Sequence, residues 1–260
     1  MRNLGLQRNN APLRENSKSI LDNEEENIMI KLVAFDLDGT LAELGKGMTQ
    51  DQVELLKGLE EKGIKIAICS GKPTYYLCGF MRQIGLKQPI LVGENGAVIQ
   101  FGVDLPPKNF FVAPYSAEAA ETIRFFSEEI HKRIPDAWYQ PNMVELTPFL
   151  QRESDFSIVE ACLEEMKDHL RDVSVYRFSD CYDFVPNGIT KKSGMENLGK
   201  LLGITADEMV AAGDGENDLP MFEYAKISVG VGEKVKAYVD KCFENTTDML
   251  KYLTEIAERQ

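Results

Sequence analysis

Short apolar runs alternate with amphipathic segments along this chain, and no other feature constrains its fold as much. Strands that alternate with helices form parallel sheets with right-handed crossovers. Apolar residues at every position of a run are typical of strands that are buried on both faces. The sequence therefore predicts a parallel sheet that is covered by helices and built from the runs MIKLVAF, IKIAICS, PILVGE, MVAAGD and ISVGVG.

The alternation breaks between residues 88 and 187. Asn95-Gly96 lies between two apolar runs, which predicts a β-hairpin. Two helices and three or four further strands are expected after it, with the last two strands antiparallel and meeting near Ser179-Asp180. This order is typical of an α+β unit with its own small sheet.

The alternation resumes after residue 188. We therefore expect a doubly wound, Rossmann-like α/β core made of residues 29–87 and 188–260, with an α+β cap domain inserted at residues 88–187. Residues 1–28 are polar, rich in Asn and charge, and lack the apolar segment of a signal peptide. They are expected to form a flexible N-terminal tail, and Met29 is an alternative start of the chain.

Composition excludes several classes of function. The net charge of −13 and the pI near 4.8 argue against a nucleic-acid binder or a protein of anionic membrane surfaces. No apolar run approaches the roughly 20 residues of a membrane span. The five cysteines form no CxxC pair, so a disulfide framework or zinc site is not expected, and a reducing cytoplasm fits best.

Polar residues follow three of the predicted strands at the point where each strand ends. Asp36 and Asp38 follow the first, Ser70 the second, and Asp214 the run MVAAG. Ligands of open parallel sheets bind at the carboxyl edge, so these side chains should converge there. Neighbouring carboxylates repel each other, and a cation offsets that cost. With Asp218 they form an oxygen-rich set without His or Cys, which favours Mg²⁺ over zinc.

Two consecutive lysines, Lys191 and Lys192, open the helix that follows the insertion. A lysine, a divalent cation, a hydroxyl and several carboxylates together suit a phosphoryl group, because the cations neutralise its charge while a carboxylate attacks phosphorus. A small phosphorylated metabolite is therefore the expected partner despite the acidic composition.

Four motifs in order, DLDGT, CSGK, ITKKSG and GDGENDLPM, resemble those of the haloacid dehalogenase-like superfamily. The resemblance covers residues 29 to about 245. ENGA after the third strand and the position of the insertion are similar to the branch of Cof-type sugar phosphatases, sucrose-phosphatase-like enzymes and archaeal phosphoglycolate phosphatases. This resemblance implies Mg²⁺-dependent hydrolysis of a small phosphomonoester, either a sugar phosphate or phosphoglycolate.

The resemblance also implies roles for the carboxylates. Asp36 would be the nucleophile that forms an aspartyl-phosphate. Asp38 would protonate the leaving oxygen and then deprotonate the hydrolytic water. The Asp36 carboxylate, the Asp38 main-chain carbonyl and Asp214 would hold Mg²⁺. Asp218 would either ligate the metal, directly or through water, or orient the lysine.

The remaining motif residues would hold the phosphate. Ser70 and the Gly71 amide would bind its oxygens, and Lys191 would bridge the phosphate and Asp36. Lys192 competes for that role, but Lys191 is favoured because it follows Gly-Ile-Thr at the family spacing. Asn217 would lie at the rim and contact substrate.

Two other functions fit the same motifs. The first is a sugar phosphomutase, which returns the phosphoryl group to a sugar. The second is a non-catalytic phosphosugar-binding protein that kept the fold. In the phosphatase, the cap should close over the carboxyl edge of the core sheet and exclude water during phosphoryl transfer. Specificity is expected on the open face of the cap sheet, which alternation alone does not identify.

Overall fold

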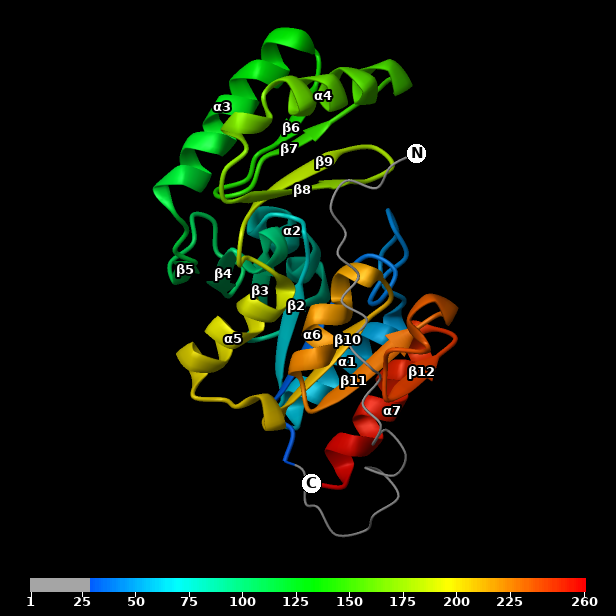
Figure 1. Ribbon diagram of the computed structural model, residues 1–260. Helices are drawn as coiled ribbons and strands as arrows, with labels where there is room; N and C mark the ends of the chain where they lie inside the picture. Colours follow the sequence, from blue (N-terminus) through cyan, green and yellow to red (C-terminus); the bar gives the residue numbers. More distant parts are fainter. Residues whose placement is uncertain (1–28) are drawn as a thin grey trace.

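The computed structural model describes residues 29–260, and the tail predicted for residues 1–28 lies outside the described residues. Eight strands form one central sheet in the order β12-β11-β10-β1-β2-β3-β4-β5 (Figure 1). Their bounds are β1 Leu32–Phe35, β2 Lys65–Cys69, β3 Ile90–Gly93, β4 Val98–Phe101, β5 Phe110–Val112, β10 Met209–Gly213, β11 Ile227–Val231 and β12 Lys241–Phe243.

Six neighbouring strands of this sheet, from β12 to β3, are parallel. Helices cover both of its faces. One face carries α1 (Gln50–Glu61), α2 (Thr74–Ile84) and α7 (Thr246–Glu258), and the other carries α5 (Lys191–Leu202) and α6 (Leu219–Tyr224). The prediction of a doubly wound α/β core is thereby confirmed.

Strand β1 shows why its sequence is apolar at every position. Val33 and Phe35 pack among the helices of the first face, whereas Leu32 and Ala34 pack among those of the second. All four residues are buried. A strand between two helical layers has no solvent-facing side, so strict polar alternation is lost.

The sheet extends past residue 88, where the sequence predicts the cap to begin. Strand β3 pairs with β2 in parallel, and β4 and β5 continue the sheet in antiparallel fashion through the Asn95-Gly96 hairpin. Residues 90–112 therefore belong to the central sheet. The hairpin signal is correct, but a hairpin can extend an existing sheet as readily as it can start a new one.

The cap consists of two helices over four short strands. The elements are α3 (Ala117–Arg133), β6 (Trp138–Gln140), β7 (Thr147–Phe149), α4 (Glu153–Glu165), β8 (Val173–Arg177) and β9 (Tyr182–Pro186). The strands form two antiparallel pairs, β6-β7 and β8-β9, and isolated bridges join β7 and the preceding loop to β9. Both helices lie on the outer side, so the strands face the core (Figure 1).

The two faces of the cap sheet differ in chemistry. Tyr182 and Phe184 of β9 pack with the helices in an apolar cluster. Asp183 lies between them in sequence and therefore on the opposite face, where its carboxylate accepts a hydrogen bond from the Thr147 hydroxyl at 2.8 Å. On that same face, the Gln140 amide donates to the Gly71 carbonyl of the core at 3.2 Å. The open face of the cap thus carries polar side chains, and it contacts the core beside Ser70, at the carboxyl end of β2.

All five cysteines lie within the described residues and are free. Among the helices of residues 29–260, none combines the length and apolar character that a membrane crossing requires.

Replacing Gly194 by Ala is expected to lower the free energy of unfolding by about 1–3 kcal/mol. A Cβ atom at this position in α5 would lie 2.7 Å from the Gly96 Cα and 2.9 Å from the Val92 Cγ1. Gly79→Ala in α2 is the matched control, since nothing lies within 4 Å of its added Cβ. The control should be neutral or should gain about 0.5–1 kcal/mol. Urea denaturation compares the two variants, and equal effects would refute close packing of α5 on the hairpin.

Candidate active site

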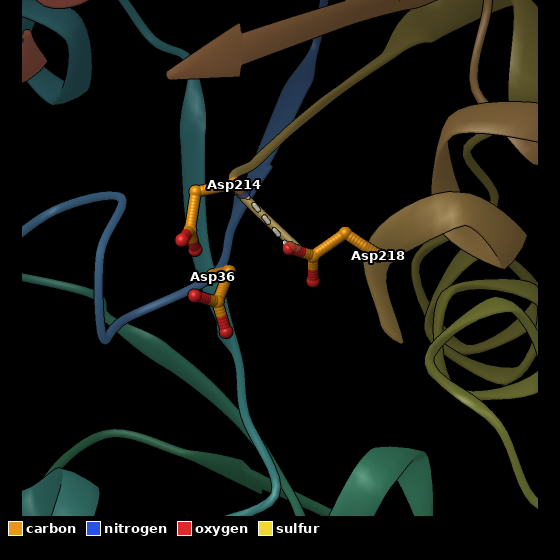
Figure 2. Close-up of side chains that lie close together, drawn as sticks. All are labelled: Asp36, Asp214 and Asp218. Carbon is orange, nitrogen blue, oxygen red and sulfur yellow. Dashed lines mark hydrogen bonds between the residues drawn. The ribbon is translucent and has the colours of Figure 1, made fainter. Parts of the chain in front are cut away.

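Three carboxylates, two from neighbouring strand ends and one from the turn before α6, gather at one point of the sheet edge. Asp36 follows β1, Asp214 follows β10, and these strands pair in parallel with Phe35 beside Ala212. Asp218 reaches the same point from the turn before α6. One oxygen atom from each of the three lies within 4.8 Å of the others (Figure 2). The predicted convergence of these distant segments is present in the structure.

The ammonium group of Lys191 lies between two of these carboxylates. Its Nζ is 2.6 Å from Asp36 Oδ1 and 2.6 Å from Asp218 Oδ1, and the lysine side chain is 1% exposed. Thr190 begins helix α5 by accepting a hydrogen bond from the Ser193 amide, so Lys191 is the first helical residue. Lys192, the next residue, is half-buried and its ammonium makes neither of these ion pairs.

The second oxygen of Asp218 is held by the backbone. The amide groups of Asp214 and Gly215 each donate to Asp218 Oδ2 at 3.0 Å. A Cβ atom at residue 213 would lie 2.5 Å from the Asp218 carboxylate, so only glycine lets that carboxylate come this close to the end of β10. Asp218 is fully buried, and its other oxygen is the one that pairs with Lys191.

Asp214 is fixed from the loop that follows β1. The Thr40 hydroxyl donates to Asp214 Oδ1 at 3.3 Å. Gly39 has φ +94°, and a Cβ atom there would lie 2.4 Å from Asp214 Oδ2. The Gly-Thr pair after Asp38 therefore makes room for one carboxylate and anchors it.

Electrostatics favour a further cation at this point. Burial raises the pKa of Asp36, the charges of Asp218 and Asp214 raise it further, and Lys191 opposes them, which leaves that pKa at about 7. Burial, followed by the charge of Asp218, also raises the pKa of Asp214. Burial disfavours the charged Lys191, but the Asp36 and Asp218 charges outweigh it and raise the lysine pKa. One ammonium group does not neutralise three carboxylates.

The donor set fits Mg²⁺. All three side chains supply carboxylate oxygens, and neither His nor Cys takes part in the group. Hard oxygen donors suit Mg²⁺ or Ca²⁺ rather than zinc. Mutual repulsion of the carboxylates raises the free energy of the metal-free site, and a bound divalent cation relieves it.

The other predicted site residues are neighbours of the cluster in the chain, or follow the adjacent strand β2. Asp38 is half-buried, two residues beyond Asp36. Ser70 is buried at the end of β2, and its hydroxyl accepts a hydrogen bond from the Lys72 amide at 3.2 Å. Gly71 is half-buried, with the Asn95 side chain beside it. Asn217 is exposed in the turn before α6, which fits a place at the rim.

Sequence reasoning missed two kinds of residue here. Thr40 belongs to the first motif, and a Thr next to a Gly at a strand end is a signal for a hydroxyl that positions a carboxylate. Glu94 and Asn95 were interpreted only as part of a hairpin and a family motif. Both contact the cap, and no local sequence pattern predicts a contact with residues about 50 positions away.

A sequence profile of haloacid dehalogenase-like hydrolases matches residues 33–144 and 116–249. The chain belongs to this family. The four motifs that suggest the resemblance all lie within the matched residues, so the predicted family is confirmed.

Two curated relatives of this chain carry the names of different phosphatases. This chain is 25% identical over 205 residues to a phosphoglycolate phosphatase of Methanoculleus marisnigri, and the matched region covers 78% of this chain and 84% of the relative. It is 24% identical over 243 residues to 5-amino-6-(5-phospho-D-ribitylamino)uracil phosphatase of Bacillus subtilis, with coverage of 79% and 88%.

A solved structure shares the fold. The structure of a phosphatase of the haloalkanoate enzyme superfamily from Bacteroides thetaiotaomicron matches with a TM-score of 0.66 at 19% identity. The match covers 89% of this chain and 97% of that chain. The fold, cap included, is therefore that of known members of the superfamily.

Lys191→Met is expected to lower the free energy of unfolding by about 3–5 kcal/mol, because it leaves buried carboxylates without their counter-charge. Lys192→Met, one residue along, should change it by no more than about 0.5 kcal/mol. Urea denaturation in the presence of EDTA measures both. Equal losses would contradict the assignment of the buried ion pairs to Lys191.

Glu145 in the loop between β6 and β7 provides a pH-dependent test of the contact between cap and core. Burial raises the pKa of Glu145 well above its usual value, the charge of Asp183 adds to the rise, and the Asn95 hydrogen bond opposes it. Above about pH 4.5 the unfolded chain loses this proton before the folded chain does, so stability falls as pH rises.

Glu145→Gln should therefore be more stable than the wild type near pH 8, by about 1.4 kcal/mol for each unit of pKa shift. The difference should shrink toward pH 4.5. Denaturation curves at several pH values measure it, and a difference that does not change with pH would contradict a raised pKa for Glu145.

Proposed function

We propose that this protein is a Mg²⁺-dependent phosphatase that hydrolyses a small phosphomonoester through an aspartyl-phosphate on Asp36. The observation that carries the proposal is the buried Lys191 ammonium group, which contacts Asp36 and Asp218 beside Asp214 at the carboxyl edge of the sheet. The family and the phosphatase names of its relatives confirm the predicted class of enzyme, a phosphoric monoester hydrolase.

The first step forms a covalent bond between an Asp36 oxygen and phosphorus. The bond from phosphorus to the leaving oxygen breaks, and Asp38 donates a proton to that oxygen so that it departs as an alcohol. Lys191 keeps Asp36 oriented and balances the negative charge on the phosphoryl group. Because the Lys191 ammonium group is buried and doubly paired, it cannot swing away from Asp36.

The second step releases phosphate. Asp38, now a carboxylate, takes a proton from water, and the water oxygen bonds to phosphorus while the bond to Asp36 breaks. Asp36 is restored as a carboxylate, and inorganic phosphate leaves. Asp38 is suited to this exchange because it is half-buried and two residues from the nucleophile, whereas Asp36 is buried.

Mg²⁺ would be held by the carboxylates of Asp36 and Asp214 and by the main-chain carbonyl of Asp38. When bound, it supplies positive charge that neutralises the phosphoryl oxygens. Two further residues would support this arrangement without touching substrate: the Thr40 hydroxyl donates to Asp214, and Asp218 accepts from Lys191.

The phosphate oxygens would be bound by the Ser70 hydroxyl and the Gly71 amide. The Ser70 hydroxyl accepts from the Lys72 amide, so its own proton remains available for a phosphate oxygen. Asn217 would contact the substrate at the rim. The substrate is a sugar phosphate or phosphoglycolate, and the relatives named phosphoglycolate phosphatase support the second of these.

Asp36→Asn should abolish phosphate release from p-nitrophenyl phosphate, with a loss of about 10³-fold or more, because an amide is not a nucleophile toward phosphorus. The wild type should require Mg²⁺ and lose activity in EDTA. Near wild-type turnover by the variant would refute Asp36 as nucleophile.

Exposed Asp51→Asn in α1 serves as the control for substitution of an aspartate and should keep full activity. Phosphate release by the wild type from a panel of sugar phosphates, nucleotides and phosphoglycolate, without a bisphosphate activator, identifies the preferred substrate. The same result separates a phosphatase from a phosphomutase, and loss of release in Asp36→Asn excludes a non-catalytic binding protein.

A further inference from the structure

The Glu94 carboxylate joins the core to the cap. It accepts hydrogen bonds from three successive backbone amides of the cap: Met143 at 2.9 and 3.0 Å, Val144 at 2.8 Å and Glu145 at 3.2 Å. These amides belong to the cap loop, which we define as residues 141–146 between β6 and β7. Glu94 is 1% exposed, so water does not compete for these bonds. Hydrogen bonds to a carboxylate are among the stronger ones in proteins.

Asn95 makes the second connection between the same two segments. Its side-chain amide donates to both carboxylate oxygens of Glu145 at 3.1 Å. Its backbone amide donates to the Ser70 carbonyl at 3.1 Å, and the Glu94 amide donates to the Lys72 carbonyl at 3.1 Å. The hairpin that holds the cap loop is therefore bonded on its other side to the loop proposed to bind phosphate.

The backbone of this hairpin is strained. Glu94 and Asn95 have φ values of +52° and +51°, a region that side chains other than glycine rarely adopt. The next residue, Gly96, has φ +107°, and a Cβ atom there would lie 2.3 Å from the Thr190 carbonyl. Two strained residues in succession, packed against the start of α5, require compensation from their surroundings. The bonds to the cap loop provide it.

Apolar packing also holds the cap loop against the hairpin of residues 94–98. Val144 of the cap loop is 3% exposed and packs in a cluster with Ala97, Val98, Val185 and Ile189. Two of these residues come from the hairpin and β4, and Val185 comes from β9 of the cap. The cap loop is thus held by polar bonds on its backbone and by burial of its central side chain.

We propose that Glu94 and Asn95 are positioning residues that latch the cap loop onto the phosphate-binding loop and thereby make the enzyme select substrates that contact the cap. The effect on substrate selection rests on the proposed function, whereas the latch itself does not. The open face of the cap sheet, with Gln140, Thr147 and Asp183, remains over the carboxyl edge while the latch is closed. A substrate with a polar leaving group contacts that face, whereas a generic aryl phosphate depends on it less.

Hydrogen exchange tests the latch without any need for activity. In Glu94→Gln the negative charge is lost and one carboxylate oxygen becomes an NH₂ group, so the charge-assisted bonds weaken and the amides of Met143, Val144 and Glu145 should exchange about ten-fold faster or more. Unchanged exchange at these amides would overturn the latch.

Glu60→Gln is a matched control within the core. The Glu60 carboxylate accepts hydrogen bonds from the Lys87 and Gln88 amides at 2.8 and 2.7 Å, but it does not join core to cap. Its substitution should speed exchange at residues 87 and 88 alone. Asn95→Gly is the second variant of the latch, because glycine tolerates the positive φ while the bond to Glu145 is lost.

Kinetics test the effect on selectivity. The ratio of kcat/KM for the best sugar phosphate to kcat/KM for p-nitrophenyl phosphate should fall about five-fold or more in Glu94→Gln and less in Asn95→Gly, with the ratio unchanged in Glu60→Gln. An unchanged ratio in the latch variants would overturn the selectivity claim. Failure of the wild type to release phosphate from any substrate would contradict the proposed function instead, and the exchange result would still decide the latch.

Discussion

The ammonium group of Lys191 lies between two buried carboxylates, and the architecture around it serves to hold it there. Asp36 and Asp218 come from different parts of the chain, and each pairs with Lys191 at 2.6 Å. A buried charge is tolerated only when it is paired and hydrogen-bonded. The parallel sheet supplies the geometry, because β1 and β10 end side by side and deliver Asp36 and Asp214 to one edge. The acidic excess that remains after pairing favours a divalent cation.

The position of the cap follows from the same sheet. Strands β3 to β5 extend the sheet to one side of the catalytic edge, and the chain leaves β5 to build the cap above it (Figure 1). The hairpin between β3 and β4 lies next to Ser70 on the core side and next to Val144 on the cap side. One short segment therefore contacts both the cap and the loop that we propose to bind phosphate.

Sequence alone predicted most of the fold and the carboxylate cluster. Thr49 and Gln52 form a capping box at the start of α1, and local patterns of this kind can be predicted because they depend on few residues. Short edge strands such as β5 and β12 carry weak periodicity and were not predicted. The antiparallel strands β4 and β5 lie in the central sheet rather than in the cap, which the sequence does not indicate, because hairpin chemistry does not tell which sheet a hairpin joins. The contacts of Glu94 with the cap depend on tertiary structure and have no local signal.

The most direct test of the central claim is a crystal structure of the protein with Mg²⁺ and beryllofluoride, which mimics a phosphoryl group on a carboxylate. The account predicts beryllium bonded to an Asp36 oxygen, Lys191 beside its fluorides, and one Mg²⁺ held by Asp36 and Asp214. Beryllofluoride on another residue, or Mg²⁺ bound away from these two carboxylates, would contradict it.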